Sequence, residues 1–384
     1  MVSRVASIRL AGSLAAMRKG RNKLILFYCN TPYHLFNAIH VKKNVLKPDV
    51  EADIMISDLI DLQAYIEPLS RCGLFRKVIA LSDRDLVRGF NQLKEPEKTK
   101  IYKSASKFMA HIQVTQDYTG LYCFYVDPYL KALYYLLIQE GLRPAVHLIE
   151  DGLSSYVVDF SESQDVVNRH YKKKALTNNI SEMLLYEPEF CLVAERYPVY
   201  SLEKIKKHDS GLKTIYQDVF GSLPLPQEKF IFFEEAFLDN YHLASDLIMV
   251  KELAGLVGKE NITIKPHPRN SPDRWLRQGL KVMTRSKTPW EVSVLFNGLA
   301  DKVLLTASSA APLNSSIVFE IQAPTFLLYK LMQIGNSVQV RQRGFHDFVD
   351  RAMEKYNKER VELFAPNNQQ VMLEQLKYIK AWSQ

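Results

Sequence analysis

The sequence has few cysteines, and their spacing excludes two common roles. The 384 residues contain four, Cys29, Cys72, Cys123 and Cys191, and no two of them form a Cys-x-x-Cys pair. Such spacing provides neither a zinc motif nor a disulfide framework, and it suits a protein of the reducing cytoplasm. Cys29 and Cys123 lie inside apolar runs, so we expect both to be buried.

Long apolar runs are also missing. No uncharged apolar stretch approaches the ~20 residues that a membrane-spanning helix needs. The first 23 residues mix Arg and Lys with apolar blocks that are too short for a secretory signal. Two interpretations of this basic tail stay open: a frayed terminus, or a basic amphipathic helix resting peripherally on the anionic inner face of the plasma membrane.

The chain has no Gly-x-Gly-x-x-Gly motif after its first strand-like run, so a dinucleotide site is not indicated. It has no internal repeat and no low-complexity segment. Lys and Arg number 50 against 42 Asp and Glu, a formal net charge of +8. This balance favours anionic partners, but the charges are scattered and not interleaved with aromatic residues along one face, which argues against nucleic acid.

Apolar strand-like runs alternate with helical patterns along most of the chain, and the stretch from Asp83 to about Gln116 is polar and helix-like. The predicted strands are 24–29, 53–57, 77–81, 121–126, 145–149, 230–233, 261–265, 303–306 and 324–329. This alternation predicts an α/β protein with mostly parallel sheets. We expect a basic tail over residues 1–22, a Rossmann-like domain over 23–221 and a second Rossmann-like domain with terminal helices over 227–384. The linker is Ser222-Leu-Pro-Leu-Pro226, because two close prolines interrupt both helix and strand. Two such halves predict a cleft between them.

The first candidate site residue is Asp151, in the turn Glu150-Asp151-Gly152 that follows the strand 145–149. In open α/β sheets, ligands bind outside the carboxyl ends of the strands. A carboxylate at such an end can accept a proton from an incoming hydroxyl, as a general base. Glu150 could face the same cleft or turn away into an ion pair. A turn of this composition also arises for conformational reasons alone.

Further candidates follow later strands. Lys265 and His267, in Lys265-Pro-His-Pro268, could meet an anion such as a phosphate, although the same stretch also reads as a surface turn. Ser308 and Ser309 precede a predicted helix with Pro312 in its first turn, so they predict either helix initiation or an anion site at the helix terminus. Glu291 is either a first-turn acid or a bidentate acceptor for ribose hydroxyls.

Three short motifs, Glu150-Asp151-Gly152, Lys265-Pro-His-Pro268 and Ser308-Ser309, together resemble those of bacterial sialyltransferases. The opening Tyr28-Cys-Asn-Thr-Pro-Tyr-His-Leu-Phe-Asn-Ala38 is similar to the first strand and turn of glycosyltransferase family 52, which includes lipooligosaccharide sialyltransferases. The order and spacing of the motifs, over about residues 24 to 330, carry this resemblance.

The resemblance implies a GT-B fold, with an N-terminal acceptor domain and a C-terminal nucleotide-sugar domain. It implies metal-independent transfer of sialic acid from CMP-sialic acid, with inversion, to a galactose-terminated acceptor of a bacterial surface glycan. By position, Asp151 would be the base and His267 would stabilise the departing CMP phosphate. Ser308 and Ser309 would hold that phosphate, and Glu291 would take the ribose. No cofactor is implied. Whether the chain forms a homodimer stays open.

Other functions remain as alternatives. Family 52 also contains glucosyl-transferring members, and polyol-phosphate transferases of teichoic-acid type carry a comparable Lys-x-His-Pro and a double Ser. Those enzymes usually show a second His motif in the preceding half, where this chain has Asp151, which favours glycosyl transfer. A non-catalytic module that binds an anionic glycan or a nucleotide is a third alternative.

Overall fold

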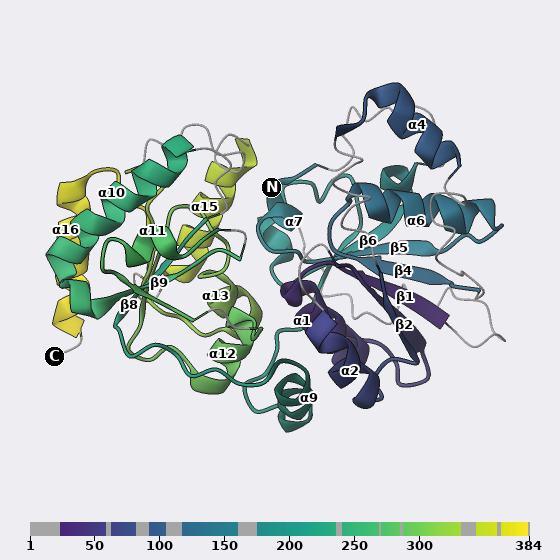
Figure 1. Ribbon diagram of the computed structural model, residues 1–384, viewed down its shortest axis with the longest axis horizontal. Helices are drawn as coiled ribbons and strands as arrows, with labels where there is room; N and C mark the ends of the chain where they lie inside the picture. Colours follow the sequence, from purple (N-terminus) through teal and green to yellow (C-terminus); the bar gives the residue numbers. More distant parts are fainter. Residues whose placement is uncertain are drawn as a thin grey trace.

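The computed structural model describes residues 24–58, 63–81, 92–104, 117–159, 175–235, 240–268, 270–284, 287–331, 343–358 and 362–382. The basic tail therefore lies outside the described residues, as does part of the polar stretch predicted as helical between Asp83 and Gln116. Within the described parts, the strands form two separate sheets (Figure 1).

The first sheet has seven parallel strands in the order β3-β2-β1-β4-β5-β6-β7. Chain order runs outward from β1 in both directions, which is the doubly wound arrangement of a Rossmann-like domain. The predicted strands are β1, β2, β3, β4 and β5, and the structure adds β6 and β7. Their bounds are Leu24–Cys29, Glu51–Ile56, Lys77–Ala80, Gly120–Cys123, Ala145–Ile149, Ile180–Leu185 and Val199–Ser201.

Helices lie on both faces of this sheet, α1 and α2 on one side and α6 with α4 on the other (Figure 1). The α1 helix starts well because Thr31 caps it and Pro32 occupies its first position. The capping side chain of Asp127 and the following Pro128 do the same for α6. The helices are α1 (Pro32–His40), α2 (Gln63–Arg71), α4 (Glu95–Lys103), α6 (Pro128–Gln139), α7 (Ser154–Val157) and α9 (Ser210–Phe220).

The second sheet repeats the arrangement with six parallel strands in the order β10-β9-β8-β11-β12-β13. Two of them, β10 and β13, are two residues long and were not predicted. The strands are β8 (Phe230–Phe233), β9 (Ile262–Lys265), β10 (Lys281–Val282), β11 (Val303–Thr306), β12 (Thr325–Leu327) and β13 (Leu363–Phe364). The helices are α10 (Asn240–Val257), α11 (Asp273–Leu276), α12 (Trp290–Asn297), α13 (Asn314–Phe319), α15 (Arg343–Tyr356) and α16 (Gln369–Trp382).

Each half has an apolar interior, and the larger of the two cores continues from the first half into the second. The ring of Phe36 in α1 meets that of Phe319 in α13 with centroids 5.9 Å apart. Farther along the junction, α15 packs against α7. The halves are thus joined by buried apolar contacts as well as by the chain, and the predicted burial of Cys29 and Cys123 is confirmed.

Candidate active site

Asp151 lies just beyond β5, and its carboxylate is held by two side chains of the first half. One oxygen, Oδ1, is 2.5 Å from His34 Nε2, and Oδ2 accepts a hydrogen bond from the Ser154 hydroxyl at 3.0 Å. The backbone N–H of Asp151 donates to the Ser155 hydroxyl at 2.7 Å. The Asp151 side chain remains 21% exposed. It is therefore oriented and still open to an incoming group.

The ring of His34 is fixed on both sides. Its Nδ1 accepts a hydrogen bond from the Asn30 backbone N–H at 3.3 Å, so the ring proton of the neutral imidazole lies on Nε2, which donates to Asp151. The Asn30 side chain donates to Asp127 at 2.8 Å. Phe124 stacks on the imidazole with centroids 4.3 Å apart and planes 7° from parallel. His34 belongs to the opening motif Tyr28–Ala38, but no role was predicted for it.

Glu150 does neither of the two things predicted for it. Its side chain is fully buried and accepts hydrogen bonds from the Tyr33 and Tyr156 hydroxyls and from the Tyr186 backbone N–H. Burial raises its pKa to about 7, against the lowering effect of these hydrogen bonds. Of the two acids in the turn, Asp151 is thus the one that a ligand can reach.

In the second half, the candidate residues follow β9 and β11, and a buried carboxylate holds the first group. The backbone N–H of His267 donates to Glu234 Oε2 at 2.8 Å. Glu234 also accepts from Arg274 Nε at 2.7 Å and from Trp275 Nε1 at 2.9 Å. The half-buried His267 side chain is thereby carried on a fixed backbone at the end of β9.

The double Ser differs from the prediction in one respect. The helix after it, α13, begins at Asn314, so Pro312 lies in a turn before the helix and Ser308 does not cap it. Ser308 is buried, and both its N–H and its hydroxyl donate to Glu235 Oε1, the hydroxyl at 2.8 Å. The half-buried Ser309 donates its N–H to Thr306 Oγ1 at 3.0 Å. The N–H groups of both serines and the Ser308 hydroxyl are therefore engaged within the protein, and no helix terminus lies beside them.

Lys265 and Glu291 are brought together. Burial lowers the pKa of the Lys265 ammonium, and the negative charge of the Glu291 carboxylate raises that pKa in part. The Lys265 Nζ lies 5.8 Å from the centre of the Phe233 ring. Glu291 is 5% exposed, and its Oε1 accepts from Asn314 Nδ2 at 2.7 Å. One carboxylate oxygen is therefore already engaged, which limits the predicted bidentate grip on a ribose.

The two halves meet beside two of the candidate residues, Asp151 and Ser309. Gly152 has φ +87°, and a Cβ placed on it would lie 3.5 Å from the Cβ of Ala310, which follows Ser309. The Asp151 turn thus faces the double-Ser turn across the junction. Strand order explains why. Ser308 and Glu235 follow the neighbouring strands β11 and β8, where the winding of the second sheet reverses. At the same point of the first sheet, Phe124 follows β4, and His34 lies in the first turn of α1, the helix after β1.

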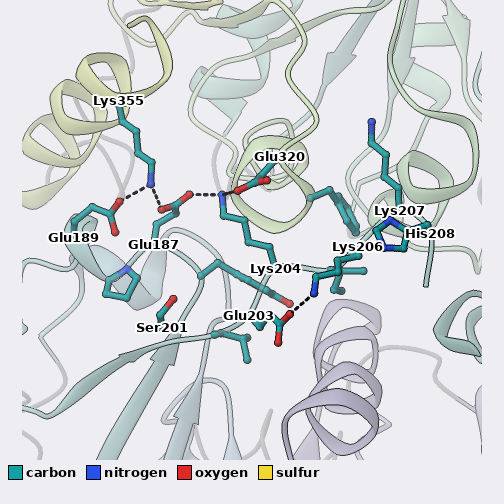
Figure 2. A pocket seen from close by; sticks show the side chains of 15 residues that line it. Glu187, Glu189, Ser201, Glu203, Lys204, Lys206, Lys207, His208, Glu320 and Lys355 are labelled. Atoms are coloured by element: carbon teal, nitrogen blue, oxygen red, sulfur yellow. Dashed lines mark hydrogen bonds and ion pairs between the residues drawn. The ribbon is translucent and has the colours of Figure 1, made fainter. Parts of the chain in front are cut away.

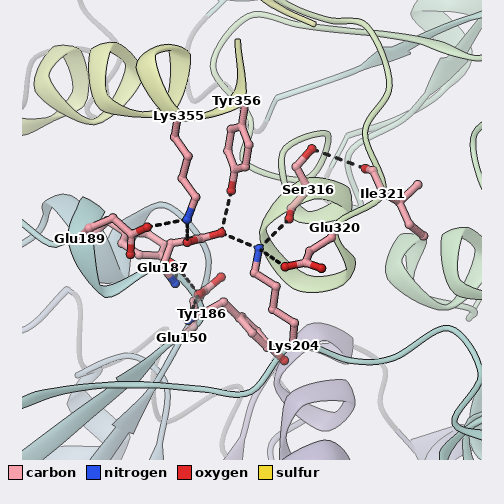
Figure 3. Close-up of polar contacts among 11 residues, drawn as sticks. Glu150, Tyr186, Glu187, Glu189, Lys204, Ser316, Glu320, Ile321, Lys355 and Tyr356 are labelled. Atoms are coloured by element: carbon pink, nitrogen blue, oxygen red, sulfur yellow. Dashed lines mark hydrogen bonds and ion pairs between the residues drawn. The ribbon is translucent and has the colours of Figure 1, made fainter. Parts of the chain in front are cut away.

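A cavity of about 680 Å³ lies farther along the same junction (Figure 2). Its charged lining is largely paired: Lys206 with Glu203, and Lys204 and Lys355 with Glu187. Lys204 also donates to the Ser316 carbonyl, and Tyr356 donates to Glu187 at 3.1 Å (Figure 3). This cluster links the two halves and leaves little unpaired positive charge for an anion.

Two kinds of feature are absent from the described residues. No group of three or more His, Cys, Asp or Glu side chains there is placed to hold a metal ion. One Asp-x-Asp pattern, Asp83-Arg84-Asp85, lies outside those residues. No helix in the described parts is long and apolar enough to cross a membrane.

No protein-family model and no curated protein sequence matches the chain. Solved structures do match. The UDP-GlcNAc 2-epimerase of Methanocaldococcus jannaschii, in complex with UDP-GlcNAc and UDP, is 10% identical, with a TM-score of 0.51 over 93% of this chain and 92% of that one. An alpha/beta-galactoside alpha-2,3-sialyltransferase of the marine bacterium Photobacterium phosphoreum is 11% identical, with a TM-score of 0.43 over 90% and 99%.

At such identities the likeness concerns the fold. The epimerase match covers both halves and agrees with the two doubly wound sheets, so the expected GT-B type of fold, two Rossmann-like domains facing each other, is confirmed. The chemistry has to be argued from the site, because folds of this kind host many reactions.

Proposed function

We propose that this protein is an inverting glycosyltransferase that moves sialic acid from CMP-sialic acid to a hydroxyl of a terminal sugar. The resemblance of its motifs to those of sialyltransferases points to galactose as that sugar. The observation that carries the proposal is the juxtaposition of the two turns. Gly152, next to Asp151, meets Ala310, next to Ser309. This contact supports a site in which a proton acceptor from one half and anion-binding residues from the other act together, as a transfer between an acceptor hydroxyl and a phosphate-linked donor requires.

On the acceptor side, Asp151 takes the proton of the attacking hydroxyl. The oxygen forms a bond to the anomeric carbon from the face opposite the phosphate, the bond from that carbon to the phosphate oxygen breaks, and its electron pair leaves with CMP. His34 and Ser154 donate to the carboxylate and hold it in one orientation. Orientation of this kind is worth several kcal/mol of barrier in general, because a misplacement of about 1 Å costs about 100-fold in rate.

On the donor side, His267 stabilises the departing phosphate. Ser308, Ser309 and Lys265 bind the same phosphate. Removal of one such donor typically costs about 3 kcal/mol of transition-state stabilisation. Glu291 is the candidate for the ribose. The departing CMP carries its negative charge on a phosphate that these side chains can bind, so the proposed reaction needs no metal ion.

The test is incubation with CMP-sialic acid and a panel of galactose-terminated acceptors, with and without EDTA, and product detection by mass. Parallel reactions contain UDP-glucose, UDP-GlcNAc or CDP-glycerol, which represent the alternative donors. The proposal predicts a sialylated product in both EDTA arms. Product from a UDP-sugar or CDP-glycerol alone would assign the site to another donor, and loss of product with EDTA would contradict metal independence.

A further inference from the structure

Glu235 occupies the donors that the proposed function gives to a phosphate. It is the second residue after β8, and its Oε1 accepts hydrogen bonds from both the N–H and the hydroxyl of Ser308. Ser308 is only 2% exposed, so another acceptor reaches these groups only by displacing Glu235. Glu235 was not among the site residues predicted from the sequence. An internal carboxylate thus sits at the point where the second sheet reverses its winding, the usual ligand position in such sheets.

A carboxylate and a phosphate compete for the same kind of donor. Both are anions that form their strongest hydrogen bonds with N–H and O–H groups, and like charges at short range repel strongly in a partly dry site. Burial raises the pKa of Glu235 to about 7, against the lowering effect of the Ser308 hydrogen bonds, and the nearby Asp246 raises it further. The negative charge of the Glu235 carboxylate is therefore unfavourable at this buried position even before a phosphate binds.

The main chain at Glu235 cannot move far with its side chain. Asn270 Nδ2 donates to the Glu235 carbonyl at 2.7 Å, and the preceding Glu234 is held by Arg274 and Trp275. A carboxylate displaced from Ser308 by rotation of its side chain consequently stays close to whatever replaces it.

We propose that Glu235 is a specificity-determining residue of the donor site: the donor phosphate displaces its carboxylate from Ser308, and the remaining negative charge disfavours a second phosphate. The proposal rests on the proposed function, because it assigns Ser308 to a phosphate. It makes the site selective for a nucleoside monophosphate over a diphosphate, which is one of the two differences between CMP-linked and UDP-linked sugars, the base being the other.

The test is calorimetric titration of the full chain with CMP and with UDP. The variants are Glu235→Gln, whose amide oxygen still accepts from Ser308 without the charge, and Glu235→Ala, which frees the Ser308 donors. Glu260→Gln, at an exposed position in the same half, is the control for net charge. Both Glu235 variants should bind CMP about tenfold tighter than the wild type and gain more for UDP, while the control matches the wild type. Thermal unfolding checks that each variant is folded.

The outcomes separate this proposal from the function on which it rests. Unchanged or weaker binding of both nucleotides by the Glu235 variants, with CMP binding by the wild type, overturns the role of Glu235 and leaves the donor assignment standing. An equal gain for CMP and UDP overturns the selectivity. A gain for UDP without CMP binding by any form supports the role of Glu235 and rejects CMP as the donor nucleotide. Failure of every form to bind either nucleotide rejects both.

Discussion

A Cβ on Gly152 would lie 3.5 Å from the Cβ of Ala310, although the two residues follow strands of different sheets. The backbone of Gly152 has φ +87°, a conformation that costs an L-residue about 1–2 kcal/mol. Two constraints thus fall on one residue beside the candidate base: a left-handed backbone and close approach of the other half of the molecule.

Gly152→Ala should lose about 1–2 kcal/mol of unfolding free energy and also lower turnover, because strain in this turn shifts Asp151. Gly141→Ala is the matched control, since Gly141 has φ +84° with nothing within 4 Å of its added Cβ. We expect it to lose similar stability at unchanged turnover. Urea unfolding and initial rates measure the two effects. Equal turnover of the two variants would show that the contact with Ala310 has no bearing on the site.

His34 should act by positioning Asp151. Replacement by Gln removes the imidazole that Asn30 and Phe124 orient. We expect kcat to fall by up to about 100-fold, as for a misplaced catalytic group, with the Kd for CMP unchanged. Rapid-mixing or steady-state rates give kcat, and calorimetry gives Kd. A variant that loses CMP affinity and keeps kcat would place His34 on the donor side instead.

The pH dependence of stability should carry a contribution from His40. This side chain is 1% exposed; its Nε2 donates to the Glu203 carbonyl at 2.8 Å, and burial lowers its pKa to about 4. Since the unfolded chain takes up this proton near pH 6.5 and the folded one near pH 4, unfolding free energy should fall as pH drops between those values. The full effect is about 3 kcal/mol.

The comparison that isolates this effect is His40→Gln, which keeps a donor for the Glu203 carbonyl and cannot titrate. Glu150 and Glu235 have raised pKa values of about 7, so they add the opposite slope to both proteins, which the difference cancels. Denaturant titrations at pH 7.5, 6 and 5 provide the free energies. A difference that stays constant over this range would contradict a buried neutral His40.

Local pattern predicted most of the fold. The strands β1, β5, β8 and β11 have the predicted bounds because each is a short apolar run, buried along nearly its whole length and closed by polar residues. The strand β6 was missed because it contains Ser181 and Glu182 in a polar stretch. Glu182 is accommodated there by His147 of the neighbouring strand, 2.9 Å away, and such a partner cannot be seen in local sequence.

In the candidate site, too, some residues could be predicted from local sequence and others could not. Asp151, His267, Ser308 and Ser309 could be found because each follows a strand-like run. Their partners could not, because His34 and Glu235 reach them only through strand order, which places loops from distant parts of the chain side by side. One signal was available: Glu234-Glu235 follows the apolar strand β8 as Glu150-Asp151 follows β5.

The central claim is that Asp151 accepts the proton of an acceptor hydroxyl while the other half holds a CMP-linked donor. The most direct measurement is a single-turnover reaction of CMP-sialic acid with a galactose-terminated acceptor, catalysed by the wild type and by Asp151→Asn, with CMP affinity determined for both. The account predicts that the variant binds CMP normally and loses about 10²–10⁴-fold in rate, the usual contribution of a general base. Transfer by the Asn variant at the wild-type rate would contradict it.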